Sequence, residues 1–384
     1  MRKIHSMAVV NILVALATVL AVGSGCLKKS SNCGLSPCGL GADGSSPCSG
    51  SGGCPYANGG GEVQPGPYQI FAIHQSQKFA YFVHPAMNGF LYVYNVDQAT
   101  GRLVINNMVQ TIQGADALVI NPNGKFVHVS SSSKDLFATY SINQENGSLG
   151  KVEEIQGASK SGPVFLLPTL AGYFMYSVNL YGGSISVYRV DADRGSMSQQ
   201  DIKYTKYSPM GPDTDSQGRF MYVPSFGASY VHVYSINGAT GQITETQVAD
   251  NGAGTKPIFV KTAGQYLYVS NFYKNTLNVM RRDPGNGSLS LASTVNVGSR
   301  PSHIALGPDG AKLYVVAEGA GTVTAFGINQ ASGALGSLGT KSAGSLPISV
   351  VIHPAGKAAY VMNFQSVEIQ TFGIDASGAL GGKL

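Results

Sequence analysis

Short apolar runs alternate with clusters of Gly, Pro, Asp and Asn from about Tyr68 to the end of the chain. β-branched and aromatic residues dominate these runs, and none of them is long enough for a helix of ordinary length, so the pattern predicts strands. In the unit that begins at Pro301 we expect three strands, at 302–306, 312–316 and 322–328. A fourth strand ends each unit, as at 148–155 in an earlier one, so each unit is predicted to hold four antiparallel strands.

The unit recurs seven times with an almost constant period. A tyrosine column, with one histidine, marks the second strand of each unit: Tyr81, His128, Tyr176, Tyr222, Tyr268, Tyr314 and Tyr360. A glycine column marks the turn before the fourth strand: Gly101, Gly147, Gly195, Gly241, Gly287, Gly333 and Gly378. Successive members of either column are 45 to 48 residues apart. Glycine suits this turn because hairpin turns of this kind require a positive φ.

A shared period of roughly 40–50 residues indicates a propeller, a solenoid or an array. Solenoid repeats are usually shorter or contain helix, so four-stranded units without helix favour the propeller. We therefore predict an all-β fold, a seven-bladed β-propeller with four antiparallel strands per blade, over residues 68–384. Only residues 379–384 remain for the fourth strand of the last blade, and we expect residues 62–67 to lie along its edge and help close the ring.

Residues 1–25 have the character of a signal peptide. Arg2 and Lys3 precede an apolar stretch at 7–22 that is too short for a comfortable membrane span. Cys26 directly follows a run of Gly and Ser, which resembles a bacterial lipoprotein signal, although Leu is missing three residues before the Cys. We expect an exported protein that is anchored to a membrane of the cell envelope through lipidated Cys26, with ordinary cleavage and secretion as the alternative.

Residues 26–67 are predicted to form a linker, because Gly, Ser, Pro and Cys dominate them and bury too little apolar surface to order a chain. Four cysteines of this linker form an even set in an exported chain, which is consistent with one or two disulfides in any of three pairings: Cys33, Cys38, Cys48 and Cys54. Their spacing and the lack of a nearby His weigh against zinc or an iron–sulfur cluster, and no haem-attachment motif occurs. We expect no metal and no cofactor.

Charge excludes some partners. The formal net charge is +5, and removal of residues 1–25 leaves 23 basic and 20 acidic residues that are scattered along the chain. Nothing forms a basic stripe, so nucleic acid is not an expected partner. Charged residues make up 12% of the chain and 50 residues are Gly, which suits an exported all-β domain.

The repeats provide an internal control, since a residue that most blades share is expected to serve the blade. Asn179, Asn271 and Asn363 recur three residues after the tyrosine column. Asn at this position suits a tight turn because it tolerates a left-handed conformation, and the alternative is a ring of ligand-binding amides.

Two residues break their columns together. Counting from the turn near 310, His303 and Glu318 fall nearly opposite each other across one antiparallel strand pair, and Arg300 precedes the same strand. A His–carboxylate pair beside an Arg can perform acid–base work on an anionic substrate. We expect Glu318 to keep His303 oriented and partly charged near neutral pH. The alternative is a salt bridge at the rim of the ring.

The chain resembles the lactonase-like seven-bladed propellers, which include propeller phosphogluconolactonases and carboxymuconate-cyclising enzymes, and also the looser Tyr-Val-x-Asn propeller repeats. The segment Asn179-Leu-Tyr-Gly-Gly183 is similar to the family's Asn-Tyr-x-Gly-Gly turn, and Pro301-Ser-His303 and Ala317-Glu-Gly319 are similar to its Pro-Arg-His and Asn-Glu-Leu segments. The resemblance implies that His303 and Glu318 are the catalytic pair, with Arg300 and the three asparagines as ligand-binding residues.

The departures from that family favour binding over catalysis. Ser302 stands where the family has Arg, and Ser225-Phe-Gly-Ala-Ser229 lacks both acids of Asp-Leu-Gly-x-Asp. Phe165, and Met210 or Gly211, occupy the places of two family histidines. We predict a non-catalytic propeller that presents a degenerate site to a small anionic lactone or carboxylate, or a face to a protein or polysaccharide. The alternative is a lactone hydrolase or cyclising enzyme that uses His303 and Glu318 as its acid–base pair.

Overall fold

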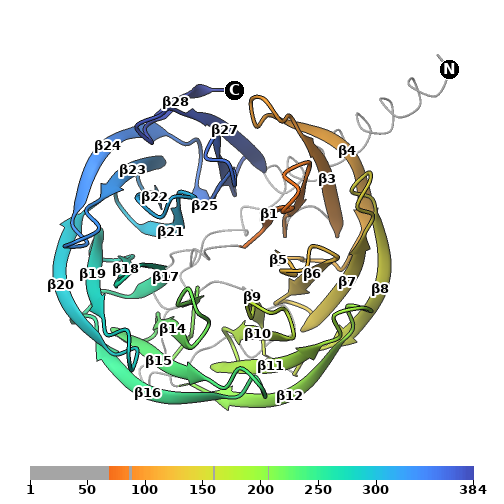
Figure 1. Ribbon diagram of the computed structural model, residues 1–384, viewed down its shortest axis with the longest axis horizontal. Coiled ribbons are helices and arrows are strands. Elements are labelled where there is room, and N and C mark those ends of the chain that lie inside the picture. Colours follow the sequence, from red (N-terminus) through yellow and green to blue (C-terminus); the bar gives the residue numbers. More distant parts are fainter. Residues whose placement is uncertain (1–68, 86–88, 159–160, 206) are drawn as a thin grey trace, which may run out of the picture. The chain divides into compact units, whose positions relative to one another are not determined.

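The computed structural model describes residues 69–85, 89–158, 161–205 and 207–384. These residues form 28 strands in seven four-stranded antiparallel sheets, and the sheets are arranged as blades around a central axis (Figure 1). No helix occurs in these ranges. The predicted seven-bladed β-propeller with four strands per blade is therefore confirmed.

Strands A to D of each blade follow one another in the sequence from the axis outwards. Strands A are β1 (Phe71–Ile73), β5 (Ala117–Ile120), β9 (Pro163–Pro168), β13 (Asp213–Thr214), β17 (Pro257–Ala263), β21 (Pro301–Leu306) and β25 (Pro347–Ile352). Strands B are β2 (Phe79–Val83), β6 (Phe126–Ser131), β10 (Phe174–Asn179), β14 (Phe220–Ser225), β18 (Tyr266–Asn271), β22 (Lys312–Ala317) and β26 (Ala358–Asn363). Strands C are β3 (Phe90–Val96), β7 (Leu136–Ile142), β11 (Ser184–Val190), β15 (Tyr230–Ile236), β19 (Thr276–Arg282), β23 (Thr322–Ile328) and β27 (Glu368–Ile374). Strands D are β4 (Leu103–Gln110), β8 (Leu149–Gln156), β12 (Met197–Tyr204), β16 (Ile243–Asp250), β20 (Leu289–Asn296), β24 (Leu335–Ser342) and β28 (Leu380–Lys383).

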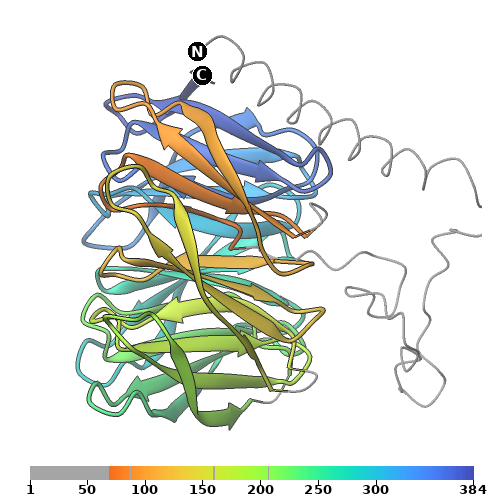
Figure 2. The same cartoon turned by 90° about the vertical axis from the view of Figure 1, so that its right-hand side faces the viewer.

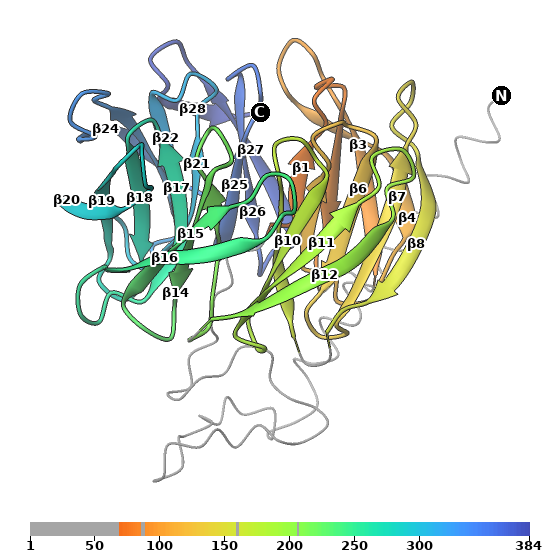
Figure 3. The ribbon, with the colours of Figure 1, turned by 60° about the horizontal axis from the view of Figure 1, so that its bottom comes forward.

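The strands run roughly along the axis of the ring, so their ends meet at two opposite faces (Figure 2). We call the face at which strands A begin and strands B end the mouth face. The D strands form the outer wall, where β8, β12 and β16 pass one another on the outside (Figure 3). Their burial alternates little, and most of their residues are exposed, whereas strands B are almost fully buried.

The tyrosine and glycine columns meet in space. In six blades the column tyrosine donates its hydroxyl hydrogen to the carbonyl of the column glycine in the next blade, as from Tyr176 to Gly241 over 2.9 Å and from Tyr268 to Gly333 over 2.9 Å. The other four pairs are Tyr81 with Gly147, Tyr222 with Gly287, Tyr314 with Gly378 and Tyr360 with Gly101. Each of these tyrosines is buried, so the bond satisfies a hydroxyl that would otherwise be stranded in the core.

Glycine is required in this column for two reasons. All seven column glycines have a positive φ between 72° and 89°, as the hairpin argument predicts. In addition, a Cβ on Gly241 would lie 2.5 Å from the ring of Phe174 in the preceding blade. The turn of one blade is therefore pressed against the first residue of strand B in its neighbour.

His128 takes the tyrosine place in blade 2 but makes a different contact. Its Nδ1 lies 3.0 Å from Thr139 Oγ1 on the neighbouring strand C, within the same blade. Burial lowers the pKa of this imidazole to about 4, so His128 is neutral at pH 7. It is therefore a packed substitute for the tyrosine, and in the described structure Gly195 lacks the inter-blade bond of its counterparts.

The last blade closes on the first through the same contact. Tyr360 donates to Gly101, Lys357 donates to the carbonyl of Gln98, and the rings of Tyr360 and Phe71 lie 5.3 Å apart. The predicted short fourth strand is present as β28, which pairs with β27. The expectation that residues 62–67 lie along this blade falls outside the described residues.

Gly241→Ala should lower the free energy of unfolding by about 2 kcal/mol or more, because the new methyl group meets the Phe174 ring and the backbone keeps a φ that disfavours Ala. Tyr176→Phe should cost less, roughly 1 kcal/mol, since it removes one hydrogen bond. Chemical denaturation provides both values. Gly238→Ala is the matched control in the same turn, because nothing lies within 4 Å of its added Cβ. Equal losses for Gly241→Ala and Gly238→Ala would contradict the packing argument.

Candidate functional site

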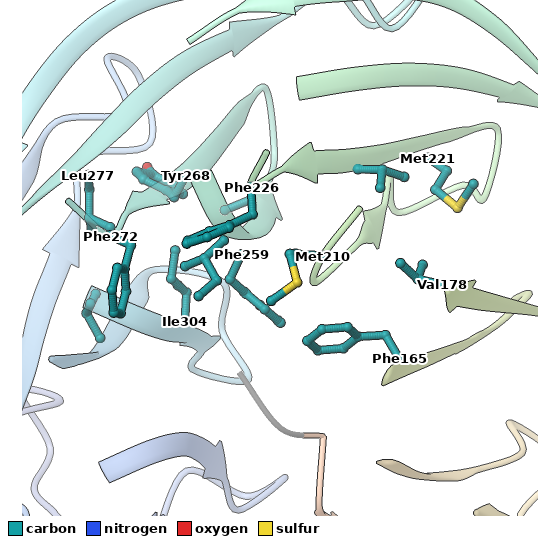
Figure 4. Packing of buried hydrophobic residues seen from close by; sticks show 14 of the residues in the cluster. Phe165, Val178, Met210, Met221, Phe226, Phe259, Tyr268, Phe272, Leu277 and Ile304 are labelled. Atoms are coloured by element: carbon teal, nitrogen blue, oxygen red, sulfur yellow. The ribbon is translucent and has the colours of Figure 1, made fainter. Parts of the chain in front are cut away.

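The mouth face of blades 3 to 6 is apolar just below its surface. Side chains from several blades converge there: Phe165, Met210, Phe226, Phe259, Phe272 and Ile304 (Figure 4). Each is no more than 8% exposed. The rings of Phe165 and Phe259, from blades 3 and 5, are 6.0 Å apart. The positions from which a polar catalytic site would be built therefore carry packed hydrophobic side chains.

Strands A of neighbouring blades approach closely around the axis. Gly211 accepts a hydrogen bond from Val260 N and donates one to the carbonyl of Ile258, each 3.1 Å long. A Cβ on Gly211 would lie 2.1 Å from the Phe259 ring. Gly211 thus allows the backbone of blade 4 to contact blade 5. A residue with a side chain would not fit at this position.

His303 lies within this apolar cluster. It is 8% exposed, its ring centroid is 4.2 Å from that of Phe259, and Val350 N donates a hydrogen bond of 3.4 Å to its Nδ1. Burial, helped by the positive charge of Lys261, lowers the pKa of His303 to about 3. The expectation of a partly charged imidazole near neutral pH is therefore wrong.

Glu318 faces Arg300 across the strand pair. Pro301 pairs with Ala317 and Ile304 with Val315, so a bulge at residues 302–303 shifts His303 along the strand. Glu318 N donates to the carbonyl of Arg300 over 2.9 Å, and Glu318 Oε1 lies 3.4 Å from an Arg300 Nη. The simple count, which set Glu318 opposite His303, is wrong because the pairs Ile304–Val315 and Leu306–Leu313 centre the turn one residue earlier than the midpoint of 303 and 318, and the bulge moves Glu318 one residue further from His303.

Arg300 is held over an aromatic ring. The centre of its guanidinium lies 4.9 Å from the centroid of Phe272, and its side chain is 29% exposed. Lys256 occupies the same place in blade 5, with Nζ 5.9 Å from the centroid of Phe226. Blades 5 and 6 therefore each present a cation above a buried phenylalanine of the preceding blade.

The backbone at these two cations is strained. Arg300 has φ = 55° and Lys256 has φ = 51°, although both are non-glycine residues that precede proline. Such a conformation costs about 1 kcal/mol or more, and strained residues cluster at functional sites. Gly162 shows that glycine serves at this position in blade 3, with φ = 60°. The same φ recurs at Leu346, which precedes Pro347 in blade 7, so this conformation belongs to the turn of the repeat, and Arg300 is distinguished by its side chain alone.

Two of the three candidate asparagines serve the fold. Asn179 Nδ2 donates to Ser184 Oγ and Ser186 Oγ, at 3.1 and 2.8 Å, within its own blade. Asn271 donates to Thr276 Oγ1 over 3.0 Å and accepts from Asn251 Nδ2 over 2.7 Å. Both end a strand B in ordinary extended geometry. The left-handed residues of these turns come four positions later, as at Gly183 and Asn275, so the turn argument misplaced them.

Asn363 differs from its counterparts. It is 1% exposed, and neither side-chain polar atom has a hydrogen-bond partner among the described residues. In blade 5, Asn251 bridges Asn271 and Asn278, with contacts of 2.7 and 2.9 Å. Blade 7 has Ala343 in the place of Asn251, which leaves Asn363 without the bridging amide.

Sequence reasoning missed Asp116, Ser132 and Tyr181. Asp116 directly precedes β5 at the mouth face and is 2% exposed. Its carboxyl oxygens accept hydrogen bonds from both N–H and O–H of Ser132. Burial raises the pKa of this carboxyl to about 7. A signal was present, because Asp116 is the only acid in a column that is otherwise Gln69, Val164, Met210, Ile258, Ser302 and Ile348.

The remaining expectations concern the cysteines, metal binding and the membrane. Cys26 and the four linker cysteines lie outside the described residues. Among those described, no group of three or more His, Cys, Asp or Glu is placed to hold a metal ion. In the same ranges no helix has the length and apolar character needed to span a membrane.

Comparison with known protein families identifies the class of this protein as a seven-bladed propeller. The family described as lactonase, 7-bladed β-propeller, matches this chain in overlapping segments: 71–210, 155–261, 249–352 and 286–383. These matches span almost the whole ring. The chain belongs to this family.

Solved structures show the same fold. A putative 6-phosphogluconolactonase from Bacteroides fragilis is 21% identical, with a TM-score of 0.69 over 77% of this chain and 89% of that one. A periplasmic gluconolactonase from Pseudomonas aeruginosa is 20% identical, with a TM-score of 0.69 over 77% and 91%. No curated protein matches the chain. At these identities the likeness concerns the fold.

Asn251→Ala should lower the free energy of unfolding by about 2 kcal/mol or more, because it leaves the buried amides of Asn271 and Asn278 without their bridging partner. Thermal and chemical unfolding measure the loss. Asn363→Ala is the matched comparison at a site that already lacks the bridge, and it should cost clearly less. A similar loss for both variants would contradict this assignment.

Asp116 should make stability depend on pH. Its folded pKa of about 7 lies above the usual value of about 3.9, so its contribution is fully present below pH 4 and is lost as the pH rises through 7. The free energy of unfolding of the parent protein, relative to Asp116→Asn, should therefore fall between pH 4 and 7 by up to about 4 kcal/mol, at 1.36 kcal/mol per pKa unit. Denaturant titrations at several pH values check this. A difference that stays constant or rises with pH would contradict it.

Proposed function

We propose that the mouth face binds a small organic anion of the lactone or carboxylate class, with Arg300 as its cation and a degenerate lactonase-like site around it. The observation that carries the proposal is Arg300 itself, whose partly exposed guanidinium is held over Phe272. A cation on an aromatic ring beside an apolar floor suits an anion with a carbon skeleton. Lys256 adds a second positive charge in the preceding blade.

Binding is favoured over turnover by the state of the expected catalytic pair. Neutral, buried His303 is a poor general acid near pH 7, because its pKa lies about four units below that pH. Glu318 is engaged by Arg300, and it is 4% exposed. The surrounding phenylalanines provide no hydrogen-bond donors that could stabilise a negative charge developing on the substrate.

Lactone hydrolysis is the second candidate, and family membership favours it. The two similar solved structures described above carry the names of a putative 6-phosphogluconolactonase and a gluconolactonase. In this alternative His303 and Glu318 act as the acid–base pair and Arg300 holds the anionic group of the substrate. Loss of lactone hydrolysis on replacing His303 and Glu318 by Ala, with folding intact, would favour the enzyme.

Arg300→Gly should weaken the binding of a carboxylate probe such as gluconate roughly tenfold or more, since a charge-assisted contact is lost. The backbone of the turn should persist, because glycine serves at the same position in blade 3, but the variant also removes the ion-pair partner of the buried Glu318 side chain, so the free energy of unfolding should fall by about 3 kcal/mol. Isothermal titration calorimetry and thermal melting give the two values.

Leu346→Gly is the matched control for this experiment. Leu346 has φ = 56° and precedes Pro347 in blade 7, so the variant relieves the same backbone strain without removing a charge. Equal affinity of the parent and Arg300→Gly for gluconate and for other small carboxylates would overturn the proposal. Hydrolysis of gluconolactone measured in parallel decides between the two candidates.

We also propose that the protein is exported and anchored through a lipid on Cys26, on the basis of the signal-like residues 1–25. The segment 26–67 would then tether the propeller, with a random-coil reach of about 30–40 Å. Cys26→Ser should move the protein from the membrane fraction to the soluble fraction of the cell envelope or the medium. An unchanged membrane-bound fraction would contradict the anchor.

A further inference from the structure

Exposed tyrosines are concentrated on one part of the mouth face. Six tyrosines are exposed in the described part of the chain, and five of them lie at the mouth ends of strands in blades 3 to 5: Tyr181, Tyr204, Tyr207, Tyr230 and Tyr273. Their exposed fractions range from 40% to 77%. We call these five residues the tyrosine patch. The sixth, Tyr173, directly precedes β10 and therefore lies on the opposite face.

Three members of the tyrosine patch meet at the turn after β14. Ser225, the last residue of β14, donates its hydroxyl hydrogen to the carbonyl of Tyr207 over 2.5 Å and pairs with Tyr230 at the start of β15. The ring of Tyr273, from blade 5, lies 6.1 Å from the ring of Phe226, the residue after Ser225. The side chains of three separate segments are therefore gathered around one turn.

The other two members extend the patch onto blade 3. Tyr204 ends β12, and Tyr181 lies in the turn between β10 and β11. Thr205, which follows Tyr204, donates a backbone hydrogen bond of 2.7 Å to the carbonyl of Gly183, two residues after Tyr181. Tyr204 and Tyr207 are three residues apart along the chain, so the five tyrosines form one continuous surface.

The repeat does not require tyrosine at these places. The last residue of strand D, which is Tyr204 in blade 3, is a short polar or amide residue in five other blades: Gln110, Gln156, Asp250, Asn296 and Ser342. Tyr204 is 77% exposed, so its ring contributes little to the core. Single exposed apolar residues are ordinary on protein surfaces, whereas a group of exposed rings on one face indicates an interaction site.

Two lysines give the patch a positive charge. Lys256 Nζ lies 5.9 Å from the centroid of Phe226, the ring that Tyr273 also contacts, and Lys274 follows Tyr273 directly and is exposed. Neither lysine belongs to an ion pair in the described part of the chain. Asp250 is the exposed acid at the mouth ends of these blades in the same ranges. The charge of the patch therefore complements an acidic partner.

We propose that the tyrosine patch binds an acidic polysaccharide, whose sugar rings lie on the tyrosines and whose carboxylates meet Lys256 and Lys274. A pyranose has an apolar C–H face that packs on an aromatic ring, and its hydroxyls bond to tyrosine hydroxyls. A polymer suits the patch because several weak contacts over three blades act together only for a ligand of repeated units. The proposal rests on the tyrosines and these lysines, and not on the anion proposed for Arg300.

The test is isothermal titration calorimetry of the full chain with hexasaccharides of galacturonate, mannuronate and hyaluronan, and with neutral maltohexaose. At least one acidic probe should bind, and maltohexaose should bind at least about tenfold more weakly. Tyr204→Ala and Tyr230→Ala should each weaken binding of the acidic probe about fivefold, because each removes one ring. Lys274→Gln should weaken it about threefold, and thermal melting verifies that each variant folds.

Tyr173→Ala is the matched control, because Tyr173 is 54% exposed but lies on the opposite face. It should change the affinity less than about twofold. Lack of binding by all three acidic probes, equal affinity for maltohexaose, or an equal loss in Tyr173→Ala would each overturn the proposal. Tighter binding of a thymidine dodecanucleotide would also overturn it, since the patch would then suit nucleic acid. Tyr204→Ala should leave gluconate binding unchanged, so failure at Arg300 and failure at the patch are measured separately.

Discussion

The hydrogen bond from a buried tyrosine to a glycine carbonyl in the next blade is the interaction on which the ring depends. It recurs between six of the seven neighbouring pairs, including the pair that joins the last blade to the first. The same glycines must have a positive φ and must also lack a side chain, because the preceding blade packs against them. The same contact in each repeat thereby fixes the position of each sheet relative to its neighbour. The contact from Tyr360 to Gly101 also joins the last blade to the first and closes the ring.

This framework leaves the ends of strands A and B free to vary. In blades 3 to 6 these positions carry phenylalanine and methionine at the mouth face. Blades 5 and 6 each add one cation above a phenylalanine ring. The positive φ at Arg300 is shared by Lys256 and Leu346 and belongs to the repeat. What distinguishes Arg300 is its partly exposed guanidinium, which lies over Phe272 and beside Glu318.

The period, the strands and the positive φ of the glycine column could be predicted from the sequence, because each follows from local chemistry repeated seven times. The relation of His303 to Glu318 could not, since it depends on the exact centre of the turn and on the bulge at 302–303. The neutral state of His303 could not be predicted either, because Phe259, which packs against it, comes from another blade. Asp116 stood out of its column, but only the fold shows that it is buried and accepts hydrogen bonds from Ser132.

The account depends most on the claim that this member of the lactonase propeller family holds an organic anion at Arg300 and not between His303 and Glu318. A crystal structure of the protein soaked with gluconate or gluconolactone tests this directly. The account predicts ligand density in contact with the Arg300 guanidinium above Phe272, with the His303 ring still packed on Phe259. A ligand whose reactive carbonyl lies within hydrogen-bond reach of both His303 and Glu318, or one bound away from the mouth face, would contradict it.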